Sequence, residues 1–388
     1  MRVAFLSDVY FPRINGVSTS IQTFRRELAL LGLETLLVAP AYDGQTQADD
    51  DTVIRLPSRS VPRDPEDRLM SLKAALALED RLRAAEVDLI HVQTPFTAHY
   101  AGQRLARRLG VPLVATYHTL FEEYLHHYLP ALPAGWLRGA ARLFSRTQCN
   151  ACDRVIVPSR AMVERLSAYG VKAPLEQLPT GIPNLQFGAG QGARFRARHG
   201  IPEDRPVALF VGRVAFEKNI GFLLEAVQVA QRQCPDILLL VAGEGPARPA
   251  LEKETARLGI AQQVRFLDYL DRQQALPDCY AGADLFVFAS RTETQGLVLI
   301  EALAAGLPVL ALSAMGTTDI LAPGEGCESG PDDPAAFGRR MAALLADRPT
   351  LARMSQAARR HAEQWSDQAM ALRLARLYRA LIAPLQAA

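Results

Sequence analysis

The sequence has little of what marks the specialised classes of protein. Its formal net charge is only +2, because 43 basic residues balance 41 acidic ones, and aromatic residues make up 7%. No sustained basic block with interleaved aromatics occurs, so we expect no nucleic-acid partner. No apolar run approaches the roughly 18 residues that a membrane span needs. What remains is the composition of an ordinary globular protein.

Cysteine is also scarce. The 5 Cys are an odd number, which fits reduced thiols in a reducing compartment. Cys149 and Cys152 form a C-x-x-C, but no second ligand pair accompanies them, so we predict structural roles for both. The first eight residues turn acidic too soon for a signal peptide. We therefore expect a cytoplasmic protein, with peripheral attachment to the inner face of the cytoplasmic membrane left open.

Short apolar strands alternate with helical stretches along the chain, which predicts doubly wound α/β sheets with parallel strands. In the first half we expect strands at residues 2–7, 34–39, 52–56, 88–93, 112–117, 153–158 and 175–178. In the second half we expect them at 206–211, 236–242, 264–267, 284–289 and 308–312.

The length of 388 residues predicts two domains, and the turn-rich stretch 178–184 is the expected boundary. We expect an N-terminal domain at residues 1–182 and a C-terminal domain at 183–367. A helix over 368–388, with no strand after it, should pack back on the first domain. Two such domains facing each other would line one cleft with the loops that follow their strands.

Two loops of the N-terminal domain carry candidate residues. Gly16 opens a helix after the first strand, where backbone amides could meet a phosphate with no Cβ in the way; the alternative is an ordinary turn. His118 follows the fifth strand, a position that favours function over a core role.

Arg213 and Lys218 straddle a helix start in the C-terminal domain. Arg can grip a phosphate through two parallel hydrogen bonds, and Lys supplies a point charge. The alternative is a salt bridge to Glu217 or another surface carboxylate. The order strand, Gly, Arg, loop, Lys, helix favours a diphosphate site.

Two carboxylates, Glu293 and Glu301, enclose seven residues around a second predicted helix start at Gly296. The amides from Thr294 through Gln295 and Gly296 to Leu297 would point at a phosphate, because a helix N-terminus favours anions. Ionised carboxylates only accept hydrogen bonds and so suit the hydroxyls of a polyol. A diphosphate joined to polyols is a nucleotide-sugar, which is the ligand that we predict.

Other polar clusters indicate no metal or cofactor. Residues 243–246, Gly-Glu-Gly-Pro, lack the third Gly and the Lys of a P-loop and predict a tight turn. His126 and His127 are adjacent and do not share a helix face. The run Asp49 to Asp51 reads as a solvated turn. We therefore expect neither a bound metal nor a cofactor.

At these positions the chain resembles the retaining GT-B glycosyltransferases of the group 1 type. Their mark is Glu-x7-Glu followed by Ala-hydrophobic-Ala-x-Gly-x-Pro-Val, and here Glu293 precedes residues 301–309, EALAAGLPV. The likeness covers nearly the whole chain. It implies two Rossmann-like domains and transfer of a hexose from a nucleotide-sugar.

A narrower likeness, carried by residues 116–119, 124–126 and 292–297, is to bacterial diacylglycerol glucosyltransferases and related mannosyltransferases. It implies a UDP-sugar donor and a lipid acceptor such as diacylglycerol. Two residues depart from the pattern: Asp268 stands where Gly is usual, and Ala289 replaces a Pro. The first departure bears on contacts to the base.

The resemblance also implies roles for the candidate residues. Arg213 and Lys218 would neutralise the leaving diphosphate, Glu293 would hold donor-sugar hydroxyls, Glu301 the ribose, and His118 would contact the sugar near its 6-hydroxyl. Such enzymes need no metal, because cations and helix dipoles stabilise the leaving group.

Other functions stay open at this point. A GDP-mannose-dependent mannosyltransferase, or transfer to a soluble or polysaccharide acceptor, would use the same motifs. A nucleotide-sugar epimerase shares the architecture, and an inactive nucleotide-sugar binder would keep the binding residues without turnover.

One predicted helix bears on the acceptor. Arg138, Arg142 and Arg146 recur every four residues, and Leu137, Ala141 and Phe144, with Trp136 and Leu143 nearby, form an apolar face beside them. Basic amphipathic helices of this kind lie in the headgroup region of anionic bilayers. The alternative is that the apolar face packs on the N-terminal sheet.

Overall fold

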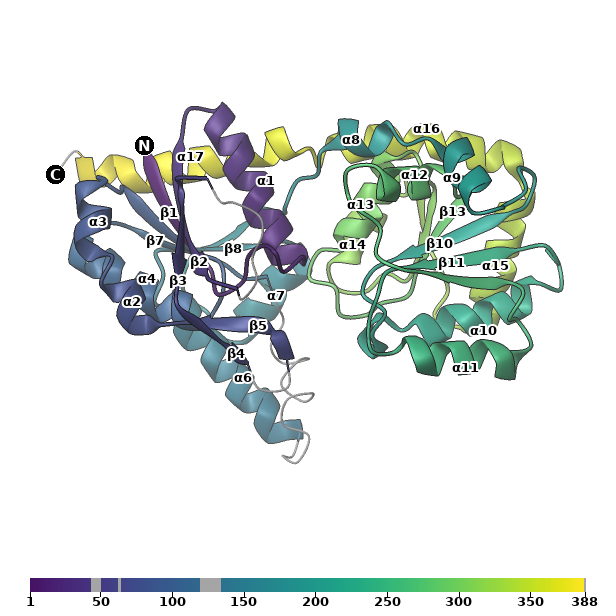
Figure 1. Cartoon of the computed structure of the whole chain (residues 1–388), viewed down its shortest axis with the longest axis horizontal. Coiled ribbons are helices and arrows are strands. Elements are labelled where there is room, and N and C mark those ends of the chain that lie inside the picture. Colours follow the sequence, from purple (N-terminus) through teal and green to yellow (C-terminus); the bar gives the residue numbers. More distant parts are fainter. Residues whose placement is uncertain (43–49, 62–63, 119–133, 387–388) are drawn as a thin grey trace. The chain divides into compact units, whose positions relative to one another are not determined.

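The computed structural model describes residues 1–42, 50–61, 64–118 and 134–386, and the chain divides into two compact units (Figure 1). Unit 1 comprises Met1–Gly181 and Asp367–Ala388, and unit 2 comprises Ile182–Ser366. The chain therefore enters unit 2 once and returns to unit 1 with its last helix. The boundary falls one residue from the one expected at 182.

Unit 1 is built on a parallel sheet with strand order β3-β2-β1-β6-β7-β8-β9. Its strands are β1 Arg2–Leu6, β2 Glu34–Pro40, β3 Val53–Leu56, β6 Leu89–Val92, β7 Leu113–Thr116, β8 Arg154–Val157 and β9 Leu175–Gln177. Its helices are α1 Gly16–Leu30, α2 Leu72–Leu76, α3 Glu79–Ala84, α4 Thr97–Leu109, α6 Ala134–Cys149, α7 Arg160–Ala168 and α17 Asp367–Gln386.

The last helix, α17, completes the core of unit 1. Its buried side chains Leu374 and Tyr378 pack with Phe5 of β1 and with Ile21 and Phe24 of α1 in one apolar cluster. The C-terminal segment is thus a covering layer of the first sheet and not an appendage.

Unit 2 carries a second parallel sheet, with order β12-β11-β10-β13-β14-β15. Its strands are β10 Val207–Val211, β11 Leu238–Ala242, β12 Val264–Leu267, β13 Leu285–Phe288, β14 Val309–Ala311 and β15 Cys327–Ser329. Its helices are α8 Asn184–Gly188, α9 Gly192–Arg198, the 3-10 helix η1 Phe216–Lys218, α10 Ile220–Ala230, α11 Arg248–Leu258, α12 Ala275–Ala281, α13 Leu297–Ala304, α14 Thr317–Leu321, α15 Pro334–Ala346 and α16 Arg348–Glu363.

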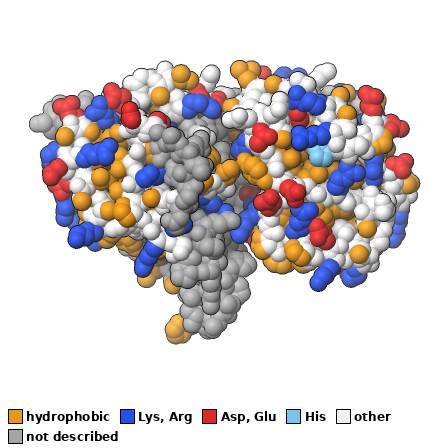
Figure 2. Space-filling model, in the orientation of Figure 1, with side chains coloured by type: hydrophobic (Ala, Val, Ile, Leu, Met, Phe, Trp, Pro, Cys, Tyr) orange, Lys and Arg blue, Asp and Glu red, His pale blue; other side chains and the backbone are white. Residues whose placement is uncertain are grey.

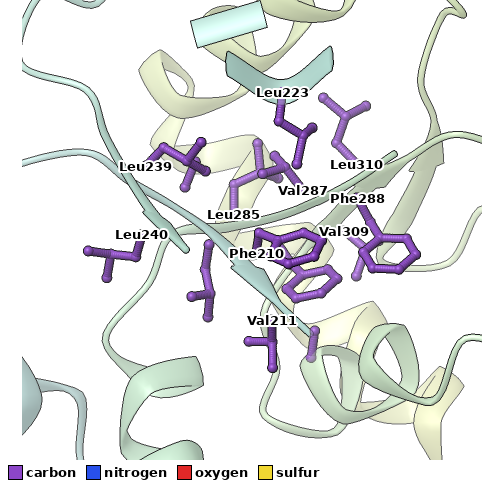
Figure 3. Packing of buried hydrophobic residues seen from close by; sticks show 14 of the residues in the cluster. Phe210, Val211, Leu223, Leu239, Leu240, Leu285, Val287, Phe288, Val309 and Leu310 are labelled. Atoms are coloured by element: carbon purple, nitrogen blue, oxygen red, sulfur yellow. The ribbon is translucent and has the colours of Figure 1, made fainter. Parts of the chain in front are cut away.

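The central strands of unit 2 are buried along their whole length, as expected for parallel strands covered on both faces (Figure 3). Phe210 of β10 and Phe288 of β13 stack with ring centroids 5.6 Å apart. This packing explains why these strands read as continuous apolar runs in the sequence.

The expectation of two parallel-sheet α/β domains is confirmed, and three strands went unpredicted. These are β4 Ser58–Val61 and β5 Asp64–Met70, which form an antiparallel hairpin, and the three-residue β15. The hairpin mixes charged residues and prolines and has no apolar run. A prediction that relies on apolar runs therefore misses this hairpin.

Both sheets have a topological switch point, where the connections of two adjacent strands leave in opposite directions. In unit 1 it lies between β1 and β6, and in unit 2 between β10 and β13. In open α/β sheets ligands bind beyond the carboxyl ends of the strands at such a point. The loops after these strands are where candidate site residues belong.

The close approach of α10 and α15 yields a stability test. A Cβ added at Gly338 of α15 would lie 2.2 Å from the carbonyl oxygen of Ala226 on α10. We expect Gly338→Ala to lower the free energy of unfolding by about 1–3 kcal/mol, because the helices must separate. Gly221→Ala on α10 is the control: no atom lies within 4 Å of its added Cβ. It should be neutral or stabilising by up to about 1 kcal/mol in urea unfolding. Equal stability of both variants would contradict the observed packing.

Candidate functional site

Two loops of unit 2 run against each other just beyond β10 and β11. The Val214 amide donates to the Glu244 carbonyl at 2.8 Å. Gly243 has φ +135°, and a Cβ there would lie 2.1 Å from the carbonyl oxygen of Gly212. Only glycine fits this position, and it lets the tight turn expected at 243–246 lie directly against the backbone of the Arg213 loop at the strand ends.

Arg213 and Lys218 lie on either side of a single turn of 3-10 helix. The Arg213 side chain is exposed, and Lys218 ends η1. Asn219, with φ +55°, then turns the chain into α10, and its side-chain amide donates to the Ala289 carbonyl at 3.1 Å. This bond ties the Lys218 turn to the end of β13.

Lys218 does not pair with Glu217. Its Nζ donates to Oε1 of Glu293 at 2.5 Å, and the two side chains are 18% and 16% exposed. The structure therefore brings together two of the sequence-predicted residues from loops 75 residues apart. The predicted cation and the predicted hydroxyl acceptor hold each other in place.

The loop that carries Glu293 is fixed through its backbone. The Gly316 amide donates to the Glu293 carbonyl at 2.8 Å, and a Cβ at Gly316 would lie 2.2 Å from the Thr294 carbonyl oxygen. Gln295 is buried, while Thr294 and Leu297 are half-buried.

Gly296 is the N-cap of the following helix, one residue before its first turn and next to the predicted start. It adopts φ +92° and precedes α13, so it has no side chain to cap the first amides of that helix. Those amides, from Leu297 onward, are ready donors for an anion.

Glu301 lies deep in α13 and is 1% exposed. One of its oxygens pairs with Arg272, and the other accepts from the Tyr280 hydroxyl at 2.9 Å. Burial and the neighbouring Glu301 carboxylate raise the pKa of Tyr280 well above its ordinary value. Burial lowers the pKa of Arg272, but the charge and the hydrogen bond of Glu301, with smaller contributions from Tyr280 and Tyr269, together outweigh burial, and the pKa of Arg272 is raised.

No motif in the sequence points to Arg272 or Tyr280. A carboxylate has about four acceptor sites, so the two bonds leave capacity for one or two hydroxyls. Arg272 also lies over the Phe187 ring, 5.7 Å from its centroid. Neither partner has a spacing relation to Glu301 that a motif could reveal.

The candidates of unit 1 lie at the ends of β1 and β7. Gly16 is the first residue of α1, whose Asn15 and Ser18 form a capping box, and a Cβ at Gly16 would meet no atom within 4 Å. His118 lies just after β7, with its Nε2 2.9 Å from Oε1 of Gln93. Burial lowers the pKa of His118 to about 4, so its ring is neutral near pH 7.

Metal-binding geometry is not found among the residues that the structure describes: no group of three or more His, Cys, Asp or Glu side chains there could hold an ion. Cys149 and Cys152 are buried free thiols whose pKa burial raises. His126, His127 and Asp49 lie outside the described residues.

Charges of both signs are mixed on the surface of unit 2 that Figure 2 shows. The balance of basic and acidic residues in the sequence therefore extends to this face.

Two Rossmann-like sheets, one with paired cations and carboxylates beyond its strand ends, define the GT-B class of glycosyltransferases. Family models agree: "Glycosyl transferases group 1" matches residues 192–361, and "Glycosyltransferase Family 4" matches residues 14–184. The chain belongs to the group 1 glycosyltransferases.

Among curated relatives, the alpha-monoglucosyldiacylglycerol synthase of Streptococcus pneumoniae is 31% identical over 80% of this chain and 71% of its own length. A GDP-mannose-dependent alpha-mannosyltransferase of Mycobacterium tuberculosis is 30% identical over 83% of this chain and 82% of its own. The predicted family and the narrower likeness are thus both confirmed.

Solved structures show the same fold. Sucrose-phosphate synthase from Thermosynechococcus elongatus superposes with a TM-score of 0.80 at 22% identity over 99% of both chains. Anabaena HepE, solved with UDP-glucose, gives a TM-score of 0.76 at 18% identity over 98% of this chain and 100% of its own.

A further observation concerns the membrane. In the part of the chain that the structure describes, no helix combines the length and the apolar character required to cross a bilayer.

The Lys218–Glu293 pair can be tested by a double-mutant cycle. Lys218→Met leaves a largely buried carboxylate without its cation, and we expect a loss of about 1–3 kcal/mol in the free energy of unfolding. Adding Glu293→Gln should restore part of that loss, because the unpaired charge is removed. The control is Arg291→Met, whose partner Asp332 forms an exposed pair with it, 50% and 57% exposed. Its cost should stay below about 1 kcal/mol. Additive effects of the two site variants would contradict the pairing.

Proposed function

We propose that this protein is a retaining α-glycosyltransferase that moves a hexose from a UDP-sugar to a lipid acceptor such as diacylglycerol. The observation that carries the proposal is the Lys218–Glu293 pair, held beside the open N-terminus of α13 at the switch point of unit 2. A cation, a hydroxyl acceptor and backbone donors then meet where a nucleotide-sugar presents its diphosphate and hexose.

Each charged residue takes a distinct part of the donor. Arg213, exposed at the end of β10, and Lys218 neutralise the diphosphate together with the first amides of α13. Glu293 accepts from hexose hydroxyls, and Glu301 uses its remaining acceptor capacity for the ribose. Binding then exchanges internal partners for those of the donor, without exposing a bare charge at any stage.

Transfer proceeds with retention by attack from the face of the leaving group. The acceptor hydroxyl oxygen forms a bond to the anomeric carbon, the bond from that carbon to the phosphate oxygen breaks, and the acceptor proton passes to the leaving phosphate. Arg213, Lys218 and the α13 dipole stabilise the charge that develops on the leaving group. Neutral His118 contacts the hexose near its 6-hydroxyl.

The lipid acceptor is supported by a surface of unit 1. On α6, Ala141 is buried, in line with the alternative in which the apolar face packs inward, whereas Trp136 is 83% and Leu143 56% exposed. The reason is that Ala141 shares the inward face of the helix with Ser145, which hydrogen-bonds to Tyr117 at 2.8 Å. The side chain of Leu137 lies outside the described residues.

A groove of about 370 Å³ runs beside these exposed residues, between α4 and α6. Its lining includes Tyr100 and His99 from α4 and Leu143 and Phe144 from α6. The guanidinium groups of Arg138, Arg142 and Arg146 are on exposed residues of the same helix. We take this surface as the contact with an anionic bilayer, with the groove open to the apolar part of the acceptor.

A second candidate is a GDP-mannose-dependent mannosyltransferase, which the mycobacterial relative favours. The two candidates differ in the base of the donor nucleotide. The resemblance to the family implies that Asp268, which replaces a usual Gly, lies near that base. Asp268 accepts from Arg248 at 2.6 Å. The discriminating experiment offers a panel of UDP- and GDP-sugars with lipid extract and identifies the product by mass spectrometry. A product formed only from GDP-mannose, or only on a soluble acceptor, would select the second candidate.

The diphosphate assignment predicts large losses of turnover. Arg213→Ala and Lys218→Ala should each lower kcat by about a hundredfold or more, because each removes charge stabilisation from the leaving group. Lys253→Ala, an exposed cation on α11, is the control and should leave kcat unchanged. Normal turnover in both site variants would show that Arg213 and Lys218 do not stabilise a leaving diphosphate.

The same mechanism predicts that no metal is required. Activity after dialysis against excess chelator should equal that of the untreated enzyme, because protein cations supply the charge stabilisation that Mg²⁺ supplies elsewhere. An absolute requirement for an added divalent ion would overturn the mechanism.

The membrane contact predicts binding to vesicles that contain anionic lipid, weakening at high salt. Arg138→Glu with Arg142→Glu should reduce binding tenfold or more, since each Arg near such a surface contributes about 1 kcal/mol. Trp136 fluorescence should shift to the blue on binding of the wild type. Arg232→Glu with Arg339→Glu, exposed residues of unit 2, makes the same charge change and should bind normally. A wild type that ignores anionic vesicles at low salt would refute the contact.

A further inference from the structure

Side chains on one face of β6 and β7 form a hydrogen-bonded ladder that ends at His118. His91 of β6 contacts Thr116 of β7 through Nε2 at 2.7 Å, and two residues further along each chain segment, just beyond the strand ends, Gln93 contacts His118 at 2.9 Å. Residues two apart in a strand share a face, so the two contacts are successive rungs. The Nδ1 of His91 lies 2.6 Å from the hydroxyl of Tyr378 on α17. The ladder thus reaches from the C-terminal helix to the end of β7.

The contact at Gln93 decides which nitrogen of His118 carries the hydrogen. Oε1 of Gln93 is a carbonyl oxygen and can only accept, so Nε2 of His118 must be the donor. A neutral imidazole has one N–H, which leaves Nδ1 as an acceptor. Burial of His118 keeps the ring neutral, with its pKa lowered to about 4.

Gln93 holds this orientation at a cost. The residue is buried, and its amide nitrogen has no hydrogen-bond partner among the residues that the structure describes. A buried donor without an acceptor destabilises a fold, and a leucine of similar size would avoid that. Leucine would also remove the acceptor that His118 requires. The need for an acceptor opposite His118 therefore explains why an amide occupies this buried position.

We propose that Gln93 is a positioning residue that fixes His118 as the Nε2–H tautomer, so that Nδ1 accepts a hydrogen bond from a hydroxyl of the bound hexose. The hexose part rests on the proposed function. Gln93 acts through His118 and does not itself touch the substrate. The ligand class is a neutral hydroxyl donor, which a protonated histidine could not accept from.

The tautomer can be read directly in the full-length protein. Histidine labelled with ¹⁵N reports which ring nitrogen is protonated, and the His118 signals are assigned by their loss in His118→Gln. We expect protonation at Nε2 in the wild type near pH 7. Protonation at Nδ1 would mean that the amide faces the other way and would overturn the proposal, whatever the behaviour of any variant.

Variants then connect the tautomer to the reaction. Gln93→Leu should give a mixture of tautomers and lower kcat/KM for the UDP-sugar about tenfold, the loss expected for one neutral hydrogen bond, while affinity for free UDP stays the same. Gln93→Glu keeps an acceptor at this position and should restore the Nε2–H tautomer and part of the rate.

The control is Thr35→Val, which removes another buried polar group of unit 1, a hydroxyl that accepts from Nε of Arg25 at 3.2 Å. It should leave both the tautomer and kcat/KM unchanged. An equal loss in this variant, or full activity in Gln93→Leu, would overturn the positioning role. If the wild type transfers sugar from none of the donors, the proposed function fails, and the tautomer measurement still tests the Gln93–His118 contact separately.

Discussion

Parallel strand pairing is the constraint on which the candidate site depends. Because every strand of unit 2 runs the same way, the loops after β10, β11 and β13 all emerge at one edge of the sheet. This common direction brings Lys218 and Glu293, which are far apart in sequence, to the same edge of the sheet. The glycines at 243 and 316 then let the loops approach each other more closely than any side chain would permit.

The second organising feature is that four charged side chains of the candidate site are paired with one another before any ligand arrives. Lys218 is bound to Glu293, and Arg272 to Glu301. Removing charges from water is expensive unless a partner compensates, so these pairs make a half-buried charged site compatible with folding. They also set the condition for binding, since a donor must offer groups that replace the internal partners at least as well.

The fold, and the loops on which most of the candidate site residues lie, could be predicted from the sequence because both leave local signals. Buried parallel strands appear as apolar runs, and the helix starts at Asn219 and Gly296 follow strand ends. Arg272, Tyr280 and Gln93 could not be predicted, since each acts through a contact made across the fold with no fixed spacing. The burial of Ala141 could not be predicted either. Periodicity identifies an apolar stripe on α6, but it does not tell which neighbouring element covers that stripe.

The proposed donor site and the proposed acceptor site are built from different kinds of structural feature. The features proposed to bind the donor depend on backbone geometry, on helix starts and on glycines, which change little without loss of the fold. The features proposed to meet the acceptor are surface side chains of α4 and α6, which substitution can alter at small cost to stability. A fold of this kind does not by itself specify a substrate: the chain is related in sequence to an alpha-monoglucosyldiacylglycerol synthase and shares its fold with a sucrose-phosphate synthase. The acceptor must therefore be argued from Trp136, Leu143 and the groove beside them, and cannot be inferred from the architecture.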